Sequence, residues 1–341
     1  MARVVSFVAP CKVVVREEPD APLLDGGVRV ETVYSGVSAG TELTQYRGSN
    51  PHLHRRWDPE RRLFVAGTAG EPYPLVAGYE EVGRVVEGAL PPGTLVWGAW
   101  GHRSTAVVPG ARARECVLPD GLAPLAAVFA RIGAIALNAV LDADVHVGET
   151  VAVFGQGVPG LIATQLVSLN GGRVIAVDAM PRRLELAGEL GAAHVVEARG
   201  RVAEEIRELT GGRGADVSIE ISGRYEALAE AIRATAYNAR VVAAGFYQGE
   251  GTALRLGEEF HHNRIAIVSS QISGVSPRLA GRWDRARLEQ TVMQLAAGGR
   301  LSLEPLVTHL VPAEDAADAF RLLDEHPEDA VQVVLEFVRD L

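Results

Sequence analysis

Residues 150–160, Thr-Val-Ala-Val-Phe-Gly-Gln-Gly-Val-Pro-Gly, form an apolar run that leads directly into a glycine-rich turn. The run has the length and β-branched content of a buried strand, and residues 161–169 have the apolar spacing of a helix. A strand, a G-x-G-x-x-G turn and a helix in this order are typical of a dinucleotide-binding βαβ unit. The stretch therefore predicts an α/β domain with a phosphate site at the helix N-terminus.

The spacing beyond the turn predicts which dinucleotide binds. A second predicted strand, 173–177, is followed by Asp178, 18 residues after Gly160. A carboxylate at this place accepts hydrogen bonds from free ribose hydroxyls and repels a 2′-phosphate, so the predicted cofactor is NAD rather than NADP. The predicted cofactor-binding residues are Gly155, Gln156, Gly157, Val158, Pro159, Gly160, Asp178 and Arg183.

The flanking sequence divides into two kinds. Downstream, apolar strands at 216–220, 240–244 and 265–269 alternate with helices at 181–190 and 225–235. This alternation predicts a parallel sheet covered by helices on both faces. The first 120 residues instead hold short strands separated by Gly and Pro, which predict a β module. An S-adenosylmethionine methyltransferase uses a similar turn and acidic residue, but the β module argues against that class.

Composition excludes several other classes. The 341 residues are 48% hydrophobic and carry a net charge of −10, which argues against a disordered chain and against nucleic acid as a partner. Two cysteines, Cys11 and Cys116, cannot make a disulfide framework or a four-cysteine zinc lobe. We see no signal peptide and no uninterrupted apolar run long enough to span a membrane, so we expect a cytoplasmic protein. Lys12 is the only lysine, which nearly excludes a catalytic lysine.

Several further segments resemble the medium-chain dehydrogenase/reductase family, the alcohol dehydrogenase-like enzymes. These segments are Gly36–Glu42, Gly78–Glu80, Val147–Gly157, Gly212–Val217, Val307–His309 and Ala316–Phe320. More narrowly, Ser35–Glu42, Phe260–Arg264 and Ser276–Asp284 resemble relatives labelled bacteriochlorophyllide or sugar-type dehydrogenases. The resemblance implies an α/β protein with a GroES-like β domain, 1–125 and 273–341, and a Rossmann domain, 126–272. It also implies a homodimer or homotetramer whose sheets pair through the last strand, near 265–270.

The resemblance implies a catalytic zinc in many members, held by a cysteine, a histidine and a third ligand. The matching positions here hold Ser38, Tyr79 and, within about a residue, Arg131. A hydroxyl, a phenol and a guanidinium are not the thiolate, imidazole or carboxylate ligands that zinc takes. The sequence therefore predicts no metal and a zinc-independent branch of the family.

Without zinc, a side chain has to supply the acid–base or hydrogen-bonding role. Tyr79 is the first candidate, with a phenol pKa lowered by Arg131; the alternative is that Tyr79 only fills the space of the metal site. Thr41 matches the family's proton-relay hydroxyl, or it only stabilises a turn. Ser38 is a candidate donor to substrate, and Glu80 is expected to support the site from behind it.

Other candidates have plainer explanations. The arginine-rich segment 47–62 is a candidate rim for an anionic substrate, although a solvated loop is the favoured interpretation. His102 follows two tryptophans, Trp97 and Trp100, and either lines a pocket or belongs to the core. His261 and His262 are expected to be structural, and Glu42 to pair with an arginine.

The sequence thus predicts an NAD-dependent oxidoreductase that interconverts a secondary alcohol and a ketone on a small-molecule substrate without zinc. One alternative is a metal-free quinone or enoyl reductase, which reduces an activated C=C bond. The other alternative is a dinucleotide-binding protein without catalytic activity.

Overall fold

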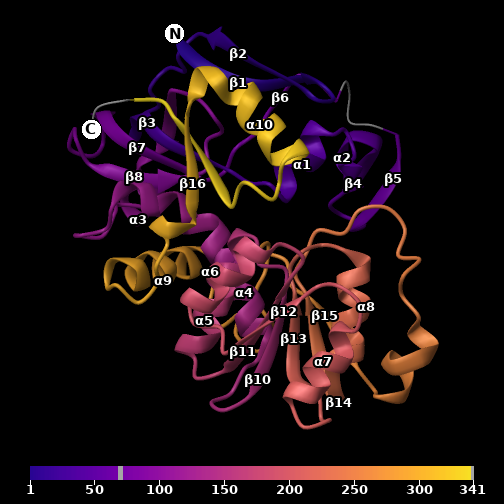
Figure 1. The fold of residues 1–341 in the computed structure, drawn as a ribbon. Coiled ribbons are helices and arrows are strands. Elements are labelled where there is room, and N and C mark those ends of the chain that lie inside the picture. The colour runs from indigo at the N-terminus through magenta and orange to yellow at the C-terminus, as the bar shows by residue number, and fades with distance from the viewer. Residues whose placement is uncertain (68–71, 339–341) are drawn as a thin grey trace. The chain divides into compact units, whose positions relative to one another are not determined.

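In the computed structural model, which describes residues 1–67 and 72–338, the strand predicted at 150–154 lies inside a parallel sheet (Figure 1). The strand order is β12-β11-β10-β13-β14-β15, and every neighbouring pair is parallel. This is the doubly wound order of a Rossmann domain, in which ligands bind beyond the carboxyl ends of the strands. The strands are β10 (Thr150–Phe154), β11 (Arg173–Asp178), β12 (His194–Glu197), β13 (Ala215–Glu220), β14 (Thr235–Ala243) and β15 (Ala266–Ser269).

Helices cover this sheet. Helices α5 and α6 contact each other, and so do α7 and α8, as the crossover connections between parallel strands require. Side chains such as Phe154, Ile175 and Ile206 are fully buried between sheet and helices. The helices are α4 (Ala130–Ala143), α5 (Val158–Leu169), α6 (Pro181–Glu189), α7 (Val202–Leu209), α8 (Tyr225–Ala234) and α9 (Arg285–Ala297), with a π-helical turn η2 at Leu256–Phe260.

The β module forms a separate unit from both ends of the chain. Strand β17 pairs antiparallel with β3, and β3 also pairs with β7 and β9. The sheets run β16-β17-β3-β7-β8, β2-β1-β6 and β4-β5. The strands are β1 (Ala2–Ala9), β2 (Lys12–Glu18), β3 (Gly27–Val37), β4 (Arg55–Asp58), β5 (Leu63–Ala66), β6 (Leu75–Val76), β7 (Glu81–Gly88), β8 (Leu95–Gly98), β9 (Thr105–Pro109), β16 (Val307–Pro312) and β17 (Gln332–Glu336).

Short helices complete this unit. Helix α10, yellow in Figure 1, packs over the β1–β2 side, where Phe320 contacts the rings of Phe7 and Tyr46. These contacts tie the C-terminal part of the chain to the N-terminal sheet. The helices are α1 (Thr41–Tyr46), α2 (Pro51–His54), α3 (Gly110–Glu115) and α10 (Ala316–Glu325), with 3-10 turns η1 (Pro124–Phe129), η3 (Glu304–Leu306) and η4 (Ala313–Asp315).

The two units divide at positions that differ from the predicted domain boundaries. The first unit is Met1–Arg131 with Glu304–Leu341, and the second is Ile132–Leu303. The prediction placed 273–303 in the β domain. In the structure the Asn138 side chain donates to Ser270 Oγ and to the Gly274 carbonyl, both at 3.2 Å. Val292 of α9 packs so closely on Gly133 that a Cβ there would lie 2.5 Å from its Cγ1. These contacts explain why 273–303 join the Rossmann unit.

The stretch Pro124–Ala143 is long and apolar enough to cross a membrane by length and composition alone. However, 72% of its most apolar window is buried inside the structure. The core helix of a soluble protein has the same property, and the half-buried Arg131 interrupts the stretch.

Candidate active site

The glycine-rich turn joins β10 to α5. Gly157 is the N-cap residue of α5, and Pro159 lies in the first turn of the helix. Gly155 has a φ of 94°, in the region that favours glycine. A Cβ on Gly160 would lie 1.8 Å from the Gly155 carbonyl oxygen, so turn and helix pack too closely for a side chain. The first N–H groups of a helix lack intrahelical partners, which makes this end of α5 a suitable site for a pyrophosphate.

Asp178 ends β11 and holds the turn in place. Its Oδ2 accepts from the Gln156 backbone N–H at 2.6 Å, and its Oδ1 accepts from the Met180 backbone N–H at 2.9 Å. The Gln156 side chain is fully buried and accepts from the Thr164 hydroxyl at 3.0 Å. Gln156 therefore faces the turn through its backbone only, and Asp178 has a structural role besides the predicted ribose contact.

Arg183 of α6 brings a positive charge to the same turn. Its Nη1 lies 3.9 Å from the place that a Cβ on Gly157 would take. Burial lowers the pKa of Arg183, and the Asp178 carboxylate acts in the opposite direction. Val158, also predicted to bind the cofactor, is 8% exposed and belongs mainly to the core. The glycines, the helix end, Asp178 and Arg183 thus form a set that fits a dinucleotide.

The candidate catalytic residues lie together in the other unit. The register of β3 and β7 pairs Ser35 with Glu81, which brings the end of β3 beside the start of β7. As a result, the Ser38 hydroxyl and the Tyr79 phenol form a hydrogen bond. Thr41, at the start of α1, lies close enough to the phenol to lower its pKa. The structure therefore brings together the three hydroxyl groups that the sequence singles out.

The predicted lowering of the Tyr79 pKa is wrong. Burial, followed by the nearby Glu80 and Glu42 carboxylates, raises the pKa of Tyr79 well above its ordinary value. The hydroxyl groups of Ser38 and Thr41 act in the opposite direction but have smaller effects. The phenol is therefore neutral at physiological pH, which makes it a hydrogen-bond donor and not a base.

Glu80 is buried next to the hydroxyl groups of Ser38, Thr41 and Tyr79, which together form the hydroxyl cluster. It is 2% exposed, and neither carboxylate oxygen has a hydrogen bond to any residue of 1–67 or 72–338. Burial and the Glu42 and Glu81 carboxylates raise its pKa, while Arg131 lowers it to a lesser degree. Arg131 thus acts on Glu80, whereas the sequence analysis paired it with Tyr79. A Cβ on Gly36 would lie 2.7 Å from Glu80 Oε2, so Glu80 packs directly on β3.

The donor set at these positions does not fit a zinc ion. The Ser38 and Tyr79 oxygens are neutral hydroxyl groups that already bond to each other, whereas zinc takes thiolate, imidazole or carboxylate ligands. Glu80 offers one carboxylate at this place, and the neighbouring Arg131 carries a positive charge. The side chains present therefore favour chemistry by hydroxyl groups.

A buried hydrogen-bond network, which no sequence motif predicts, lies behind the hydroxyl cluster. Glu42 does not pair with an arginine as expected; its Oε2 lies 2.7 Å from His102 Nε2. His102 Nδ1 lies 2.6 Å from the Ser35 hydroxyl, which donates to Glu81 Oε1 at 3.2 Å. His102 is completely buried, which supports the core interpretation. Hydrophobic patterns indicate which apolar residues are buried. No such pattern indicates that the carboxylates of Glu42 and Glu81 are buried.

The remaining candidates lie apart from this cluster or on the surface. The segment 47–62 folds into α2 and the β4–β5 hairpin instead of a loop, and Arg47, Arg55, Arg56, Arg61 and Arg62 are all exposed. Arg47 pairs with Asp324, and Arg55 donates to the Phe64 carbonyl. His261 and His262 follow the π-helical turn and are exposed.

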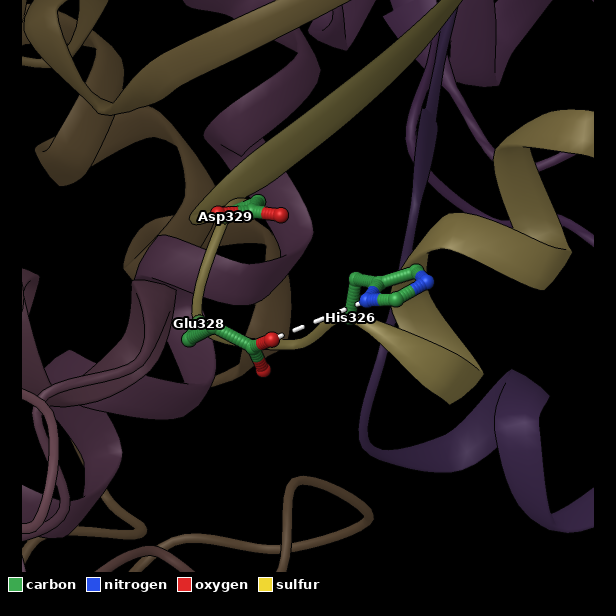
Figure 2. Close-up of side chains that lie close together, drawn as sticks. All are labelled: His326, Glu328 and Asp329. Carbon is green, nitrogen blue, oxygen red and sulfur yellow. Dashed lines mark ion pairs between the residues drawn. The ribbon is translucent and has the colours of Figure 1, made fainter.

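One group of potential metal ligands occurs among the described residues, at the turn after α10. Figure 2 shows His326, Glu328 and Asp329, with His326 Nδ1 at 3.7 Å from Glu328 Oε1. All three side chains are exposed. Exposed acidic groups of this kind are common without a metal, and these residues lie outside the hydroxyl cluster described above.

Comparison with known proteins identifies similar dehydrogenases. Residues 159–297 match the family model described as zinc-binding dehydrogenase. The D-guloside 3-dehydrogenase of Escherichia coli is 30% identical over 346 residues, which cover 96% of this chain and 98% of that protein.

Solved structures share the fold. The NADH complex of an Escherichia coli alcohol dehydrogenase has a TM-score of 0.78 and 22% identity, covering 98% of this chain and 99% of the other. The NADP complex of a zinc-binding-type dehydrogenase from Sinorhizobium meliloti has a TM-score of 0.78 and 20% identity, covering 99% of each chain. Structures of this fold therefore hold either dinucleotide.

Proposed function

This chain belongs to the medium-chain, zinc-binding-type dehydrogenase family of alcohol and sugar dehydrogenases, and we propose that it is an NAD-dependent oxidoreductase that works without zinc. The proposed reaction interconverts a secondary alcohol and a ketone. The name of the D-guloside 3-dehydrogenase, which is similar over nearly its whole length, favours a ring hydroxyl of a sugar as the substrate group.

The observation that carries the proposal is the hydrogen bond between Ser38 and Tyr79 at the positions that match metal ligands in the family. A bound nicotinamide accepts or donates the hydride. The neutral Tyr79 phenol would donate a hydrogen bond to the substrate oxygen, which stabilises the negative charge that develops on a carbonyl oxygen during reduction. In the direction of oxidation, the alcohol proton would pass to Tyr79 as the phenol proton moves on to Ser38 or to the half-buried Thr41, whose hydroxyl group would release its own proton to water, so that each hydroxyl group ends neutral.

The cofactor would be held by the glycine turn of the other unit. The N-terminal end of α5 and the Arg183 guanidinium would neutralise the pyrophosphate, and the Asp178 carboxylate would accept from the ribose hydroxyls. The last contact supports NAD over NADP, because a 2′-phosphate next to Asp178 would be repelled.

A substrate panel with two tyrosine variants tests the proposal. We expect NADH formation with secondary alcohols, among them glycosides, and a loss of kcat of at least about 100-fold in Tyr79→Phe. The Kd for NADH is expected to stay the same. Tyr73→Phe is the matched control, because its hydroxyl only donates to the Gln45 carbonyl, at 2.7 Å. Unchanged kcat in Tyr79→Phe would remove this residue from the mechanism.

The same panel separates the other possibilities. Oxidation of NADH by quinones or enones, with no reaction of ketones, would indicate the reductase of C=C bonds. Tight binding of NADH without any turnover would indicate a protein that has no catalytic activity. Elemental analysis of protein purified without a chelator or a metal-affinity tag is expected to find almost no zinc, and about one zinc per chain would contradict the metal-free mechanism.

A further inference from the structure

The buried network behind Ser38 and Tyr79 runs in series through four side chains. It leads from Glu42 to His102, from His102 to Ser35, and from Ser35 to Glu81. Glu81 Oε2 also accepts from the Trp100 backbone N–H at 2.7 Å. All four side chains are at most 1% exposed. Because these groups are buried, each of them has to find a hydrogen-bond partner inside the protein.

The number of protons in the series is fixed by its geometry. Each of the three contacts needs one proton, the Ser35 hydroxyl supplies one, and a neutral imidazole supplies another. The third proton is carried by the imidazole or by a carboxyl group. With the third proton between His102 and Glu42, His102 donates to Ser35 and Ser35 donates to Glu81. Such a charge-assisted series holds Glu42 in one orientation.

Tight packing supports the same orientation. Gly78 has a φ of 107°, and a Cβ there would lie 2.6 Å from Glu81 Oε1 and 2.6 Å from the His102 backbone nitrogen. The backbone before Tyr79 therefore lies directly against the network. Gly78 therefore limits the space on this side of His102 and Glu81.

We propose that Glu42 is a positioning residue that holds the Ser38 hydroxyl against the Tyr79 phenol, with His102 fixing the Glu42 carboxylate; the proposal rests on the proposed function of this pair. Glu42 Oε1 accepts from the Ser38 backbone N–H at 3.1 Å, and the Glu42 backbone N–H donates to the Ser38 carbonyl at 3.0 Å. These two bonds fix the backbone of Ser38, from which the hydroxyl reaches Tyr79.

Two variants of Glu42 separate hydrogen bonding from packing. Glu42→Met keeps the length of the side chain but cannot bond to Ser38 or His102, and we expect it to lower kcat about 100-fold, as a misplacement of about 1 Å does. Glu42→Gln can keep both bonds, and we expect a loss below about tenfold. Equal losses in the two variants would overturn the proposal, because packing or charge would then explain the effect.

The effect should pass through Ser38. In a Ser38→Ala background there is no hydroxyl to align, so Glu42→Met should lower kcat by less than about threefold further. Equal losses with and without the Ser38 hydroxyl would contradict the proposal. If Glu42→Met does not fold, Glu42→Asp decides instead, because it keeps the charge but is one methylene too short to reach both partners. An unchanged kcat in Glu42→Asp would then overturn the proposal.

An NMR measurement that needs no catalytic turnover tests the role of Glu42 separately from the proposed function. The ring-carbon resonance of 13C-labelled Tyr79, assigned with Tyr79→Phe, reports on its hydrogen bond with Ser38. We expect this resonance to shift in Glu42→Met or Glu42→Asp and to stay in place in Asp142→Asn, a buried carboxyl of the other unit. If the wild type turns over no substrate, the proposed function fails, yet a resonance that does not shift would still overturn the role of Glu42.

Discussion

At the scale of single residues, Glu81 and His102 both hold a proton more tightly in the folded chain than in the unfolded chain. Burial raises the pKa of Glu81 to about 7, and His102, Trp100 and Ser35 only partly offset it. Burial lowers the pKa of His102, but Glu42 and Glu81 outweigh that effect and raise it overall. The folded state therefore binds more protons than the unfolded state, and the free energy of unfolding falls as the pH rises.

This difference predicts a specific pH dependence for Glu81→Gln. Between about pH 4.5 and 7 the wild type is expected to lose up to about 3 kcal/mol of unfolding free energy from this group. The variant, which cannot ionise, should lose less over the same range. Denaturation midpoints measured from pH 5 to pH 8 check this, with Glu31→Gln, at a half-buried glutamate, as control. Parallel curves for wild type and Glu81→Gln would show that Glu81 does not titrate as described.

Asp178 holds the glycine-rich turn and is also predicted to contact the ribose. The Kd for one cofactor alone would not separate these two roles. Because its oxygens hold the Gln156 and Met180 N–H groups, Asp178→Asn is expected to weaken both NADH and NADPH. Loss of the charge also removes the repulsion of a 2′-phosphate, so the ratio of the two Kd values should shift towards NADPH by about tenfold, or about 1.4 kcal/mol.

The ratio, measured by fluorescence titration, is therefore the informative quantity. Glu197→Gln is a matched control, since Glu197 lies opposite Asp178 in the register of the neighbouring strand β12 and is exposed. An unchanged ratio in Asp178→Asn would leave Asp178 with its structural role alone.

At the scale of elements, the turn between β10 and α5 depends on contact between backbone atoms. A methyl group on Gly160 would meet the Gly155 carbonyl oxygen, which is backbone and cannot turn aside. Gly160→Ala is therefore expected to displace α5, to lower the unfolding free energy by about 1–3 kcal/mol and to weaken NADH binding.

Gly188→Ala provides the comparison within the same unit. Gly188 lies on the exposed face of α6, and a Cβ there meets nothing within 4 Å. Alanine should stabilise this helix slightly, by up to about 1 kcal/mol, because it restricts the unfolded chain more than glycine does. Thermal unfolding and NADH titration of both variants check the pair. Similar behaviour of the two variants would contradict the role assigned to Gly160.

The elements that the sequence predicts best are the fully buried ones. Strands β10 and β11 are nearly continuous apolar runs, β13 alternates apolar and polar residues, and the structure places all three within a residue of their predicted bounds. Strand β12 and helix α7 were not predicted, because β12 is a four-residue edge strand with Val195 exposed, and α7 is short. The hydroxyl cluster follows from motifs, but the hydrogen bonds of His102 with Glu42 and Ser35 join residues 60 and 67 positions apart in the chain. No local pattern reports such contacts.

At the scale of the whole molecule, the two edges of the Rossmann sheet differ. Strand β15 ends one edge with Ala-Ile-Val-Ser, and Ile267 is 37% exposed. Strand β12 ends the other edge with His-Val-Val-Glu, whose exposed Glu197 and half-buried His194 are polar. An apolar edge with unpaired backbone groups favours pairing with another chain, whereas charged side chains oppose it. We therefore propose that the protein is a homodimer, or a tetramer built from such dimers, paired through β15.

Ile267→Lys tests this proposal against Val195→Lys, which places the same charge on the other edge, where Val195 is 45% exposed. The molar mass in solution, measured by light scattering during size-exclusion chromatography, should be a multiple of the chain mass in the wild type and in Val195→Lys. Ile267→Lys should shift this mass towards the monomer, because pairing would bury its ammonium group beside the two-fold axis without a partner. The unfolding midpoint of Ile267→Lys should then depend less on protein concentration, since dissociation no longer accompanies unfolding. Equal masses in the two variants would move the interface away from β15, and a monomeric wild type would exclude it.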